Sequence, residues 1–134
     1  MAHLVIDPPT LVALVRSGRP LNSIHQLVAP NSLRSDALEL LLGAVHREEL
    51  SEREALHLHE QMTAIKIRLL GDRVSRRTAW RIARQNHWTT IKEAEYLVVT
   101  TLQADALVTI DSGLADKAEG LVSVVGFEEL FAGS

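Results

Sequence analysis

His3-Leu-Val-Ile-Asp7 places three apolar residues directly before an acid, and the pattern returns at Ala106-Leu-Val-Thr-Ile-Asp111. Short apolar runs that end abruptly are typical of strands buried in a parallel sheet. Pro8 and Pro9 follow the first run at once, which predicts that the strand ends at Asp7 and that a helix begins there. Because parallel strands end at the same edge of a sheet, the two acids are expected to lie near each other.

Helical and strand-like segments alternate between these two runs. We expect the remaining strands over residues 24–29, 65–69 and 121–125, and helices over residues 10–15, 32–46, 51–64, 73–85, 91–103 and 114–119, with a final turn at 128–131. The first helix should stop at Gly18, and Ser51-Glu-Arg-Glu54 is a capping box that starts the third. This order predicts a three-layer α/β/α fold with a mostly parallel central sheet, built as a single domain over residues 1–134.

Composition narrows the class of protein. The chain is 46% hydrophobic and 23% charged, as is usual for a globular protein, and it has no cysteine, which excludes disulfides and thiolate metal sites. The apolar stretches are much shorter than a membrane span, and no signal-peptide pattern opens the chain. We therefore expect a cytoplasmic protein without a membrane segment.

Basic residues are concentrated in one segment. Residues 66–84 contain seven lysines and arginines against one acid, which gives this segment a net charge of +6. The net charge of the whole chain is −3, so that of the remaining residues is −9. Binding of a polyanion depends on the local field, so a mildly acidic protein can still bind nucleic acid.

The basic residues of the expected helix 73–85 share one side of it. A helical wheel places Trp80 within this arc and puts Val74, Ala79, Ile82 and Ala83 on the opposite side. The face could bind phosphates and stack a base, or Trp80 could anchor a subunit interface. The arginines of the arc are Arg73, Arg76, Arg77, Arg81 and Arg84.

Four carboxylates are the candidate catalytic residues: Asp7, Asp36, Glu93 and Asp111. Carboxylates gathered without compensation are electrostatically unfavourable, and hard oxygen ligands suit Mg²⁺ or Mn²⁺. If they converge at the sheet edge, they predict a divalent-metal site.

Each acid also has an interpretation without any catalytic role. Asp7 and Asp111 could cap the helices that follow them, and Glu93 could complete a capping box with Thr90. Asp36 could lie on a solvated helical face. Capping and metal binding are compatible, because a helix N-terminus can orient a carboxylate whose other oxygen binds a cation.

The ordered set of motifs resembles the PIN-domain family, and more narrowly the VapC-type toxin ribonucleases of type II toxin–antitoxin systems. Val5-Ile-Asp7 is similar to the first motif of that family and Ala29-Pro-Asn-Ser-Leu-Arg-Ser-Asp36 to the second. Thr90-Ile-Lys-Glu93-Ala-Glu-Tyr96 and Leu107-Val-Thr-Ile-Asp111 resemble the third and fourth. The resemblance extends over nearly the whole chain.

The chain departs from that family at three places. The third acid is Glu93 where the family usually has aspartate, Pro9 stands where a serine is common, and the second acid is Asp36 rather than glutamate, with Glu39 one turn further on. Glu93 and Pro9 favour a second hypothesis, a catalytically weakened PIN-like domain that serves as a binding or scaffolding subunit.

The resemblance implies an Mg²⁺- or Mn²⁺-dependent endoribonuclease that hydrolyses RNA phosphodiester bonds. The four acids would hold the metal, and Arg73, Arg77, Arg81 and Arg84 would bind the RNA. It also implies a homodimer that is inhibited by a small VapB-like antitoxin.

Overall fold

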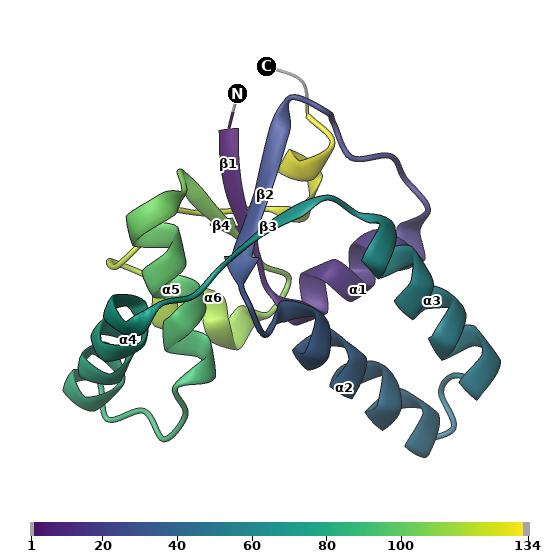
Figure 1. Ribbon diagram of the computed structural model, residues 1–134, viewed down its shortest axis with the longest axis horizontal. Coiled ribbons are helices and arrows are strands. Elements are labelled where there is room, and N and C mark those ends of the chain that lie inside the picture. Colours follow the sequence, from purple (N-terminus) through teal and green to yellow (C-terminus); the bar gives the residue numbers. More distant parts are fainter. Residues whose placement is uncertain (1, 133–134) are drawn as a thin grey trace.

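A five-stranded sheet crosses the middle of the computed structural model, which describes residues 2–132 (Figure 1). Every strand pair in this part of the chain is parallel, and the strand order is β3-β2-β1-β4-β5. The strands are β1 (Ala2–Ile6), β2 (His25–Pro30), β3 (Ile67–Leu70), β4 (Ala106–Val108) and β5 (Val124–Val125).

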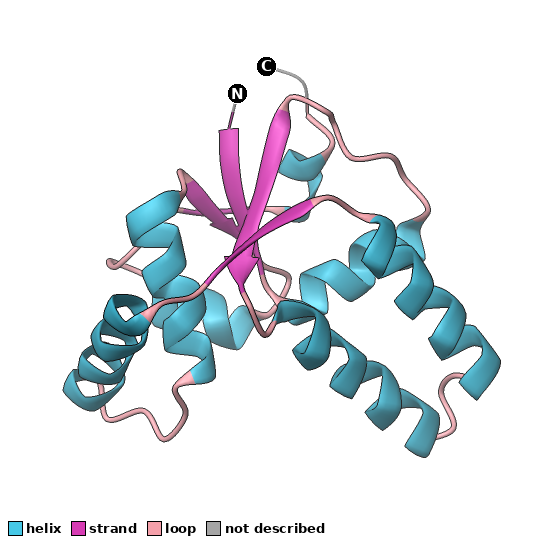
Figure 2. Cartoon of the chain, viewed as in Figure 1, coloured by secondary structure: helices cyan, strands magenta, loops and turns pink. Residues whose placement is uncertain are grey.

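Six α-helices flank the sheet, with α1, α2 and α3 to one side of it in Figure 1 and α4, α5 and α6 to the other (Figures 1 and 2). The predicted α/β fold with a three-layer arrangement is therefore confirmed, and the sheet is wholly rather than mostly parallel over residues 2–132. The helices are α1 (Pro8–Ser17), α2 (Leu33–His46), α3 (Glu52–Ala64), α4 (Arg73–Gln85), α5 (Lys92–Gln103) and α6 (Ser112–Ala118), followed by the 3₁₀ turn η1 (Phe127–Leu130).

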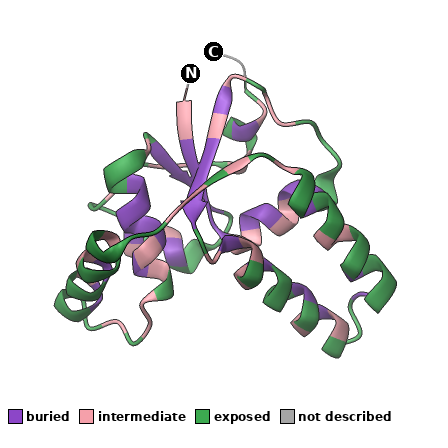
Figure 3. Ribbon diagram, in the orientation of Figure 1, coloured by how far each residue is buried: buried purple, intermediate pink, exposed green. Residues whose placement is uncertain are grey.

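The central strands are buried on both faces, whereas α3 and α4 are largely exposed (Figure 3). Val5 and Ile6 of β1 and Leu107 of β4 have no solvent-accessible surface, because helices cover both sides of the sheet. This explains why the strands have continuous apolar runs without polar alternation.

Local signals set most of the helix boundaries. Asp7 caps α1, with proline in the first turn, and Gly18 ends it in the left-handed conformation at φ 64°. Ser51 and Glu54 form the predicted capping box at the start of α3. These caps satisfy backbone groups that a helix end otherwise leaves unpaired.

Two expected strands are shorter than predicted. β4 ends at Val108 rather than Ile110, because the Ile110 and Asp111 amides donate to the side-chain hydroxyls of Thr10 and Thr109 instead of to a neighbouring strand. β5 contains only Val124 and Val125 of the expected 121–125 segment, and Leu121 is largely exposed. The other boundaries differ from the predictions by two residues or fewer.

No helix among residues 2–132 is both long enough and apolar enough to span a membrane.

Candidate active site

The four predicted carboxylates line one cavity of about 190 Å³. It lies beyond the carboxyl ends of β1 and β4, which are neighbours in the sheet although a long segment separates them in sequence. From β1 the chain continues to β2 and β3 on one side of the sheet, whereas β4 and β5 lie on the other side of β1. The strand order therefore changes direction between β1 and β4. Ligand sites in open parallel sheets form preferentially at such switch points.

Asp7 is the most buried of the four acids, with 1% of its surface exposed. Its Oδ1 accepts hydrogen bonds from the amide and hydroxyl of Thr10, and its Oδ2 accepts one of 2.7 Å from the Thr109 hydroxyl. Burial raises the pKa of the Asp7 carboxyl above its usual range, and the hydroxyl bonds from Thr10 and Thr109 oppose part of that rise. A buried carboxylate of this kind is costly to ionise unless a cation lies near it.

The two threonines link Asp7 to the end of β4. The Thr10 hydroxyl accepts from the Ile110 amide at 3.1 Å, and the Thr109 hydroxyl accepts from the Asp111 amide at 2.9 Å. Each hydroxyl therefore directs its proton toward Asp7, since its acceptor side is already used by a backbone amide. This network fixes the orientation of Asp7 relative to the segment that carries Asp111.

Asp36 lies in the first turn of α2 and is half-buried, contrary to the interpretation as a solvated residue. Its Oδ2 accepts a 3.2 Å hydrogen bond from the Tyr96 hydroxyl of α5. Burial, together with the charge of Asp36, raises the pKa of the Tyr96 hydroxyl, and the same two causes raise the pKa of Glu95. The charge of Asp36 therefore acts on two side chains of α5.

Glu93 does not form the predicted capping box with Thr90. Helix α5 begins at Lys92 with Ile91 as its cap residue, and Thr90 accepts instead from the Lys92 amide at 3.2 Å. The Glu93 carboxylate extends to α6, where its Oε1 lies 2.5 Å from the ammonium of Lys117. The capping prediction was wrong because an ion pair with an ammonium group stabilises the Glu93 carboxylate more than a hydrogen bond from the backbone amide of Thr90 would.

Asp111 caps α6, as one of the two interpretations predicted. Its Oδ1 accepts from the amides of Gly113 at 2.8 Å and Leu114 at 3.3 Å. A Cβ at Gly113 would lie 3.2 Å from that oxygen, so a small residue suits the turn. Asp111 is exposed to solvent, unlike Asp7.

All four acids share one local setting, because Asp7 and Asp111 are N-caps while Asp36 and Glu93 lie in first turns. Two of these N-termini contact the acids directly, because backbone amides of α1 and α6 donate to Asp7 and Asp111. These contacts stabilise the two carboxylates even in the absence of a metal ion, and all four acids stand at the starts of helices rather than within loops.

The donor set has the chemistry that Mg²⁺ or Mn²⁺ requires, namely several carboxylate oxygens at one cavity. The side chains do not yet converge, since no three histidine, aspartate or glutamate residues within 2–132 are arranged to hold one metal ion. Two lysines lie close to these carboxylates. Lys117 contacts Glu93, and Lys92 lies 3.8 Å from Asp36 and 3.5 Å from Glu39.

The arginine face of α4 is exposed as predicted, and Trp80 within it is 65% exposed. Ala79 and Ala83 on the opposite side pack against α5. Val74, which the helical wheel places on the same side as these alanines, is 65% exposed. None of the α4 arginines lines the acidic cavity.

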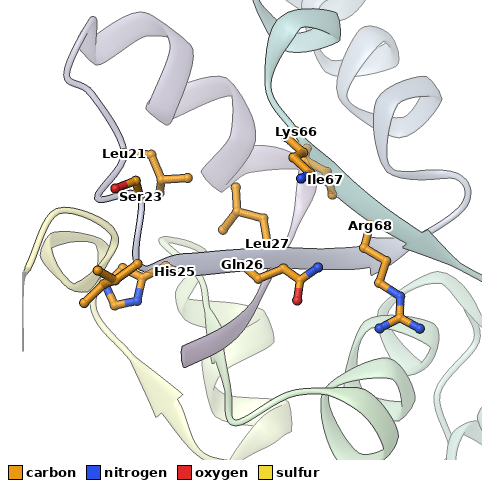
Figure 4. Close-up of a pocket in the computed structure, with 9 residues that line it drawn as sticks. Leu21, Ser23, His25, Gln26, Leu27, Lys66, Ile67 and Arg68 are labelled. Atoms are coloured by element: carbon orange, nitrogen blue, oxygen red, sulfur yellow. The ribbon is translucent and has the colours of Figure 1, made fainter. Parts of the chain in front are cut away.

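A larger cavity of about 740 Å³ lies toward the opposite end of the sheet, where β2 extends past the start of β3 (Figure 4). Its lining includes His25, Lys66 and Arg68 but no carboxylate. The Nε2 of His25 lies 2.9 Å from the Ala132 carbonyl, whereas its buried Nδ1 has no hydrogen-bond partner among the described residues. This cavity is separate from the four acids.

Sequence reasoning did not identify the residues that hold the acids in place. Thr109 precedes Asp111 by two positions, which is a weak local signal, and Tyr96 was noted only as part of a motif. Lys117 contacts Glu93 across 24 positions, and nothing in the local sequence around either residue indicates that contact.

No family model matches the sequence, and no curated protein matches it. The fold is similar to the crystal structure of PAE2754 from Pyrobaculum aerophilum, with a TM-score of 0.75 over 97% of this chain and 93% of that chain, at 19% sequence identity. At such low identity the similarity concerns the fold alone. The parallel α/β architecture that gathers the four acids is thus one that a solved protein of different sequence also adopts.

Proposed function

We propose that this protein is a divalent-metal-dependent endoribonuclease of the PIN type, the toxin of a toxin–antitoxin pair. The observation that carries the proposal is that Asp7, Asp36, Glu93 and Asp111 all line one cavity at the switch point of a parallel sheet. The four motifs that resemble the PIN family supply these same acids in order.

Asp7, Asp36, Glu93 and Asp111 would hold Mg²⁺ or Mn²⁺. The chemistry that such an ion supplies when bound is activation of water and stabilisation of charge on a phosphate. The threonine hydroxyls fix Asp7, the Tyr96 hydroxyl orients Asp36, and the α6 amides fix one oxygen of Asp111. These contacts reduce the reorganisation that the acids need when substrate arrives.

The size of the cavity favours a polymeric substrate. At about 190 Å³ it is smaller than the sites that usually enclose a whole small molecule, roughly 300–1,000 Å³. A single phosphodiester group suits that volume, while the rest of an RNA lies on the surface outside. The exposed arginines of α4 would attract and hold that outer part.

The finer parts of the proposal follow from the family resemblance. They are a homodimer, a VapB-like antitoxin that inhibits the enzyme, and a cytoplasmic location. An antitoxin that inserts a basic side chain among the four acids would suit the charge of the cavity.

A second candidate is a PIN-like domain without strong catalysis that acts as a binding or scaffolding subunit. The contact between Lys117 and Glu93 favours it, since one of the four proposed metal ligands is already paired with an ammonium group.

The test is incubation of purified protein, free of any antitoxin, with total RNA in Mg²⁺ or Mn²⁺ and with a chelator. We expect cleavage that the chelator abolishes and that falls by at least about a hundredfold in Asp7→Asn and Asp111→Asn. Asp116→Asn is the matched control, because Asp116 is an exposed acid of α6, the helix that Asp111 caps, and it does not line the cavity.

The outcomes separate the candidates. Cleavage that persists in both Asp7→Asn and Asp111→Asn would disprove the site assignment. Absence of cleavage by the unmodified protein on every RNA, with no Mn²⁺ binding at millimolar concentration, would favour the scaffolding candidate.

A further inference from the structure

Two ammonium groups contact carboxylates of the acidic cavity, and they are held very differently: Lys92 lines the cavity itself, whereas Lys117 contacts Glu93 from outside its lining. Lys117 of α6 is 2.5 Å from Glu93, and both side chains are mostly covered, at 35% and 28% exposure. Lys92 of α5 is 59% exposed and lies at longer distances from Asp36 and Glu39. Exposed pairs at such distances contribute little, so Lys117 is the stronger counter-ion.

Lys117 is also held from a second direction. Its ammonium lies over the ring of Trp88, 5.4 Å from the centroid, in a cation–π geometry. Trp88 is half-buried and packs against both apolar clusters of the protein, so its position is fixed by the core. The ammonium is therefore placed by an aromatic face and a carboxylate together.

The same short helix carries an acid of the site and the cation that contacts another of its acids. Asp111 is the N-cap of α6, and Lys117 is in its last turn, where it contacts Glu93. Within residues 2–132 no three acids or histidines are arranged to hold one metal ion, and Glu93 is in contact with Lys117. A divalent cation that took Glu93 as a ligand would meet the charge of Lys117 at contact distance, and like charges at that distance repel strongly.

We propose that Lys117 is a built-in counter-ion of Glu93, one of the acids that line the cavity, and that a divalent cation must displace it from Glu93 in order to bind. Displacement also moves the ammonium away from the ring of Trp88. Lys117 thereby weakens metal binding and makes occupancy of the site depend on a high metal concentration. This inference rests on the metal requirement of the proposed function.

The two tryptophans of the chain make the displacement observable. Trp80→Phe leaves Trp88 as the single indole, directly beneath the ammonium in question. In that background, titration with Mg²⁺, which does not itself quench fluorescence, should change the Trp88 emission as the site fills. Calorimetric titration with Mn²⁺ gives the affinity independently of any activity.

Removal of the counter-ion should strengthen metal binding. We expect Lys117→Met to bind Mn²⁺ roughly tenfold more tightly than the unmodified protein, within the usual range of coupling between two competing ligands. In Trp80→Phe/Lys117→Met the emission of Trp88 should no longer respond to Mg²⁺, because no ammonium is there to leave. Lys117→Arg keeps the charge and should keep the weak affinity. Lys66→Met, which removes a lysine from the other cavity, is the matched control and should change nothing.

The results distinguish this inference from the function on which it rests. Equal affinity in Lys117→Met and the unmodified protein would overturn the role of Lys117 and leave the metal site standing. Absence of Mg²⁺ and Mn²⁺ binding in every variant would overturn both. If Lys117→Met does not fold, as judged by thermal unfolding, Lys117→Gln keeps a polar group beside Glu93 and carries the same expectation.

Discussion

The acidic cavity and the arginine face of α4 carry opposite charge on neighbouring helices, since α4 packs against α5. In the cavity each acid has a partner: threonines for Asp7, Tyr96 for Asp36, Lys117 for Glu93 and backbone amides for Asp111. On α4 the arginines form no ion pair within residues 2–132. Among the described residues, the only hydrogen bond from the side chain of an α4 arginine is a 3.4 Å contact from Arg81 to Thr78.

This difference separates two uses of charge. Groups held by several partners have a defined position, which chemistry on a phosphate requires, and burying them is unfavourable unless those partners remain. Groups that extend into solvent have no fixed position but attract a polyanion over a distance of about 8–10 Å at ordinary salt. Substitutions in the cavity should therefore alter stability and geometry, whereas substitutions on α4 should alter affinity and its salt dependence.

The largest effect on stability is expected for Asp7→Ala. The change removes the cap of α1, worth about 1 kcal/mol, and leaves two buried hydroxyls without their acceptor, at about 1–3 kcal/mol each. We expect the free energy of unfolding to fall by about 3 kcal/mol, measured by urea denaturation. Asp116→Ala, an exposed acid, should cost under about 0.5 kcal/mol. Equal stability of the two variants would mean that the Asp7 network does not hold the fold.

The titration of Asp7 gives a second way to examine the cavity. Because burial raises its pKa, the folded protein holds the Asp7 proton more tightly than the unfolded chain does. The contribution of Asp7 to stability is therefore greatest at pH values below 3.8, which is the ordinary pKa of an aspartate. It declines as the pH rises from there through the raised pKa of the folded state. Asp7→Asn cannot titrate, so in chelator the stability of the unmodified protein relative to Asp7→Asn should fall over that range. A relative stability that rises with pH there would contradict the environment described for Asp7.

On α4 the expected effect concerns RNA binding. Replacing Arg73, Arg77 and Arg84 together by glutamine should reduce the dependence of log affinity on log salt by about 2 and weaken binding about 10- to 100-fold at 0.1 M salt. The free energy of unfolding should change by less than about 0.5 kcal/mol, because these side chains are exposed. Fluorescence anisotropy in the cleavage-deficient Asp111→Asn background measures the affinity. Arg53→Gln on α3, an exposed arginine outside the face, serves as control.

Trp80 distinguishes the two interpretations of the same face. If its ring stacks on a base, Trp80→Ala should weaken binding of single-stranded RNA by about 1–3 kcal/mol and leave the sedimentation behaviour unchanged. If it anchors a subunit interface, the change should dissociate an oligomer in analytical ultracentrifugation and affect RNA binding less.

The fold could be predicted because its signals are local. The apolar runs before Asp7 and Asp111, the prolines after β1 and the capping box at Ser51 each specify a boundary from neighbouring residues. That Asp7 and Asp111 lie at one edge was also predictable, since parallel strands end there, whereas Asp36 and Glu93 reach the same cavity from helices. The end of β4 was not, because it depends on Thr10, which is about 100 positions away in sequence.

The electrostatic partners of the acids could not be predicted from the sequence either, because they too are distant in sequence. Thr90 and Glu93 have the spacing of a capping box, and only the position of α6 reveals that Lys117 competes for the carboxylate. On α4 no such competition exists among the described residues, and the exposed arginine arc was predicted from periodicity alone.

The smallest effect that still distinguishes the two regions comes from a pair of single-group deletions. Tyr96→Phe removes the hydroxyl that donates to Asp36, in a side chain that is 3% exposed, and should lower the free energy of unfolding by about 0.5–1.5 kcal/mol. Thr78→Val removes the acceptor of Arg81 at the surface and should cost close to nothing, because water replaces a long, exposed hydrogen bond. Chemical denaturation of both variants measures the two values under one condition. If Thr78→Val costs as much as Tyr96→Phe, the arginines of α4 are held as firmly as the acids, and the division between positioned and mobile charge fails.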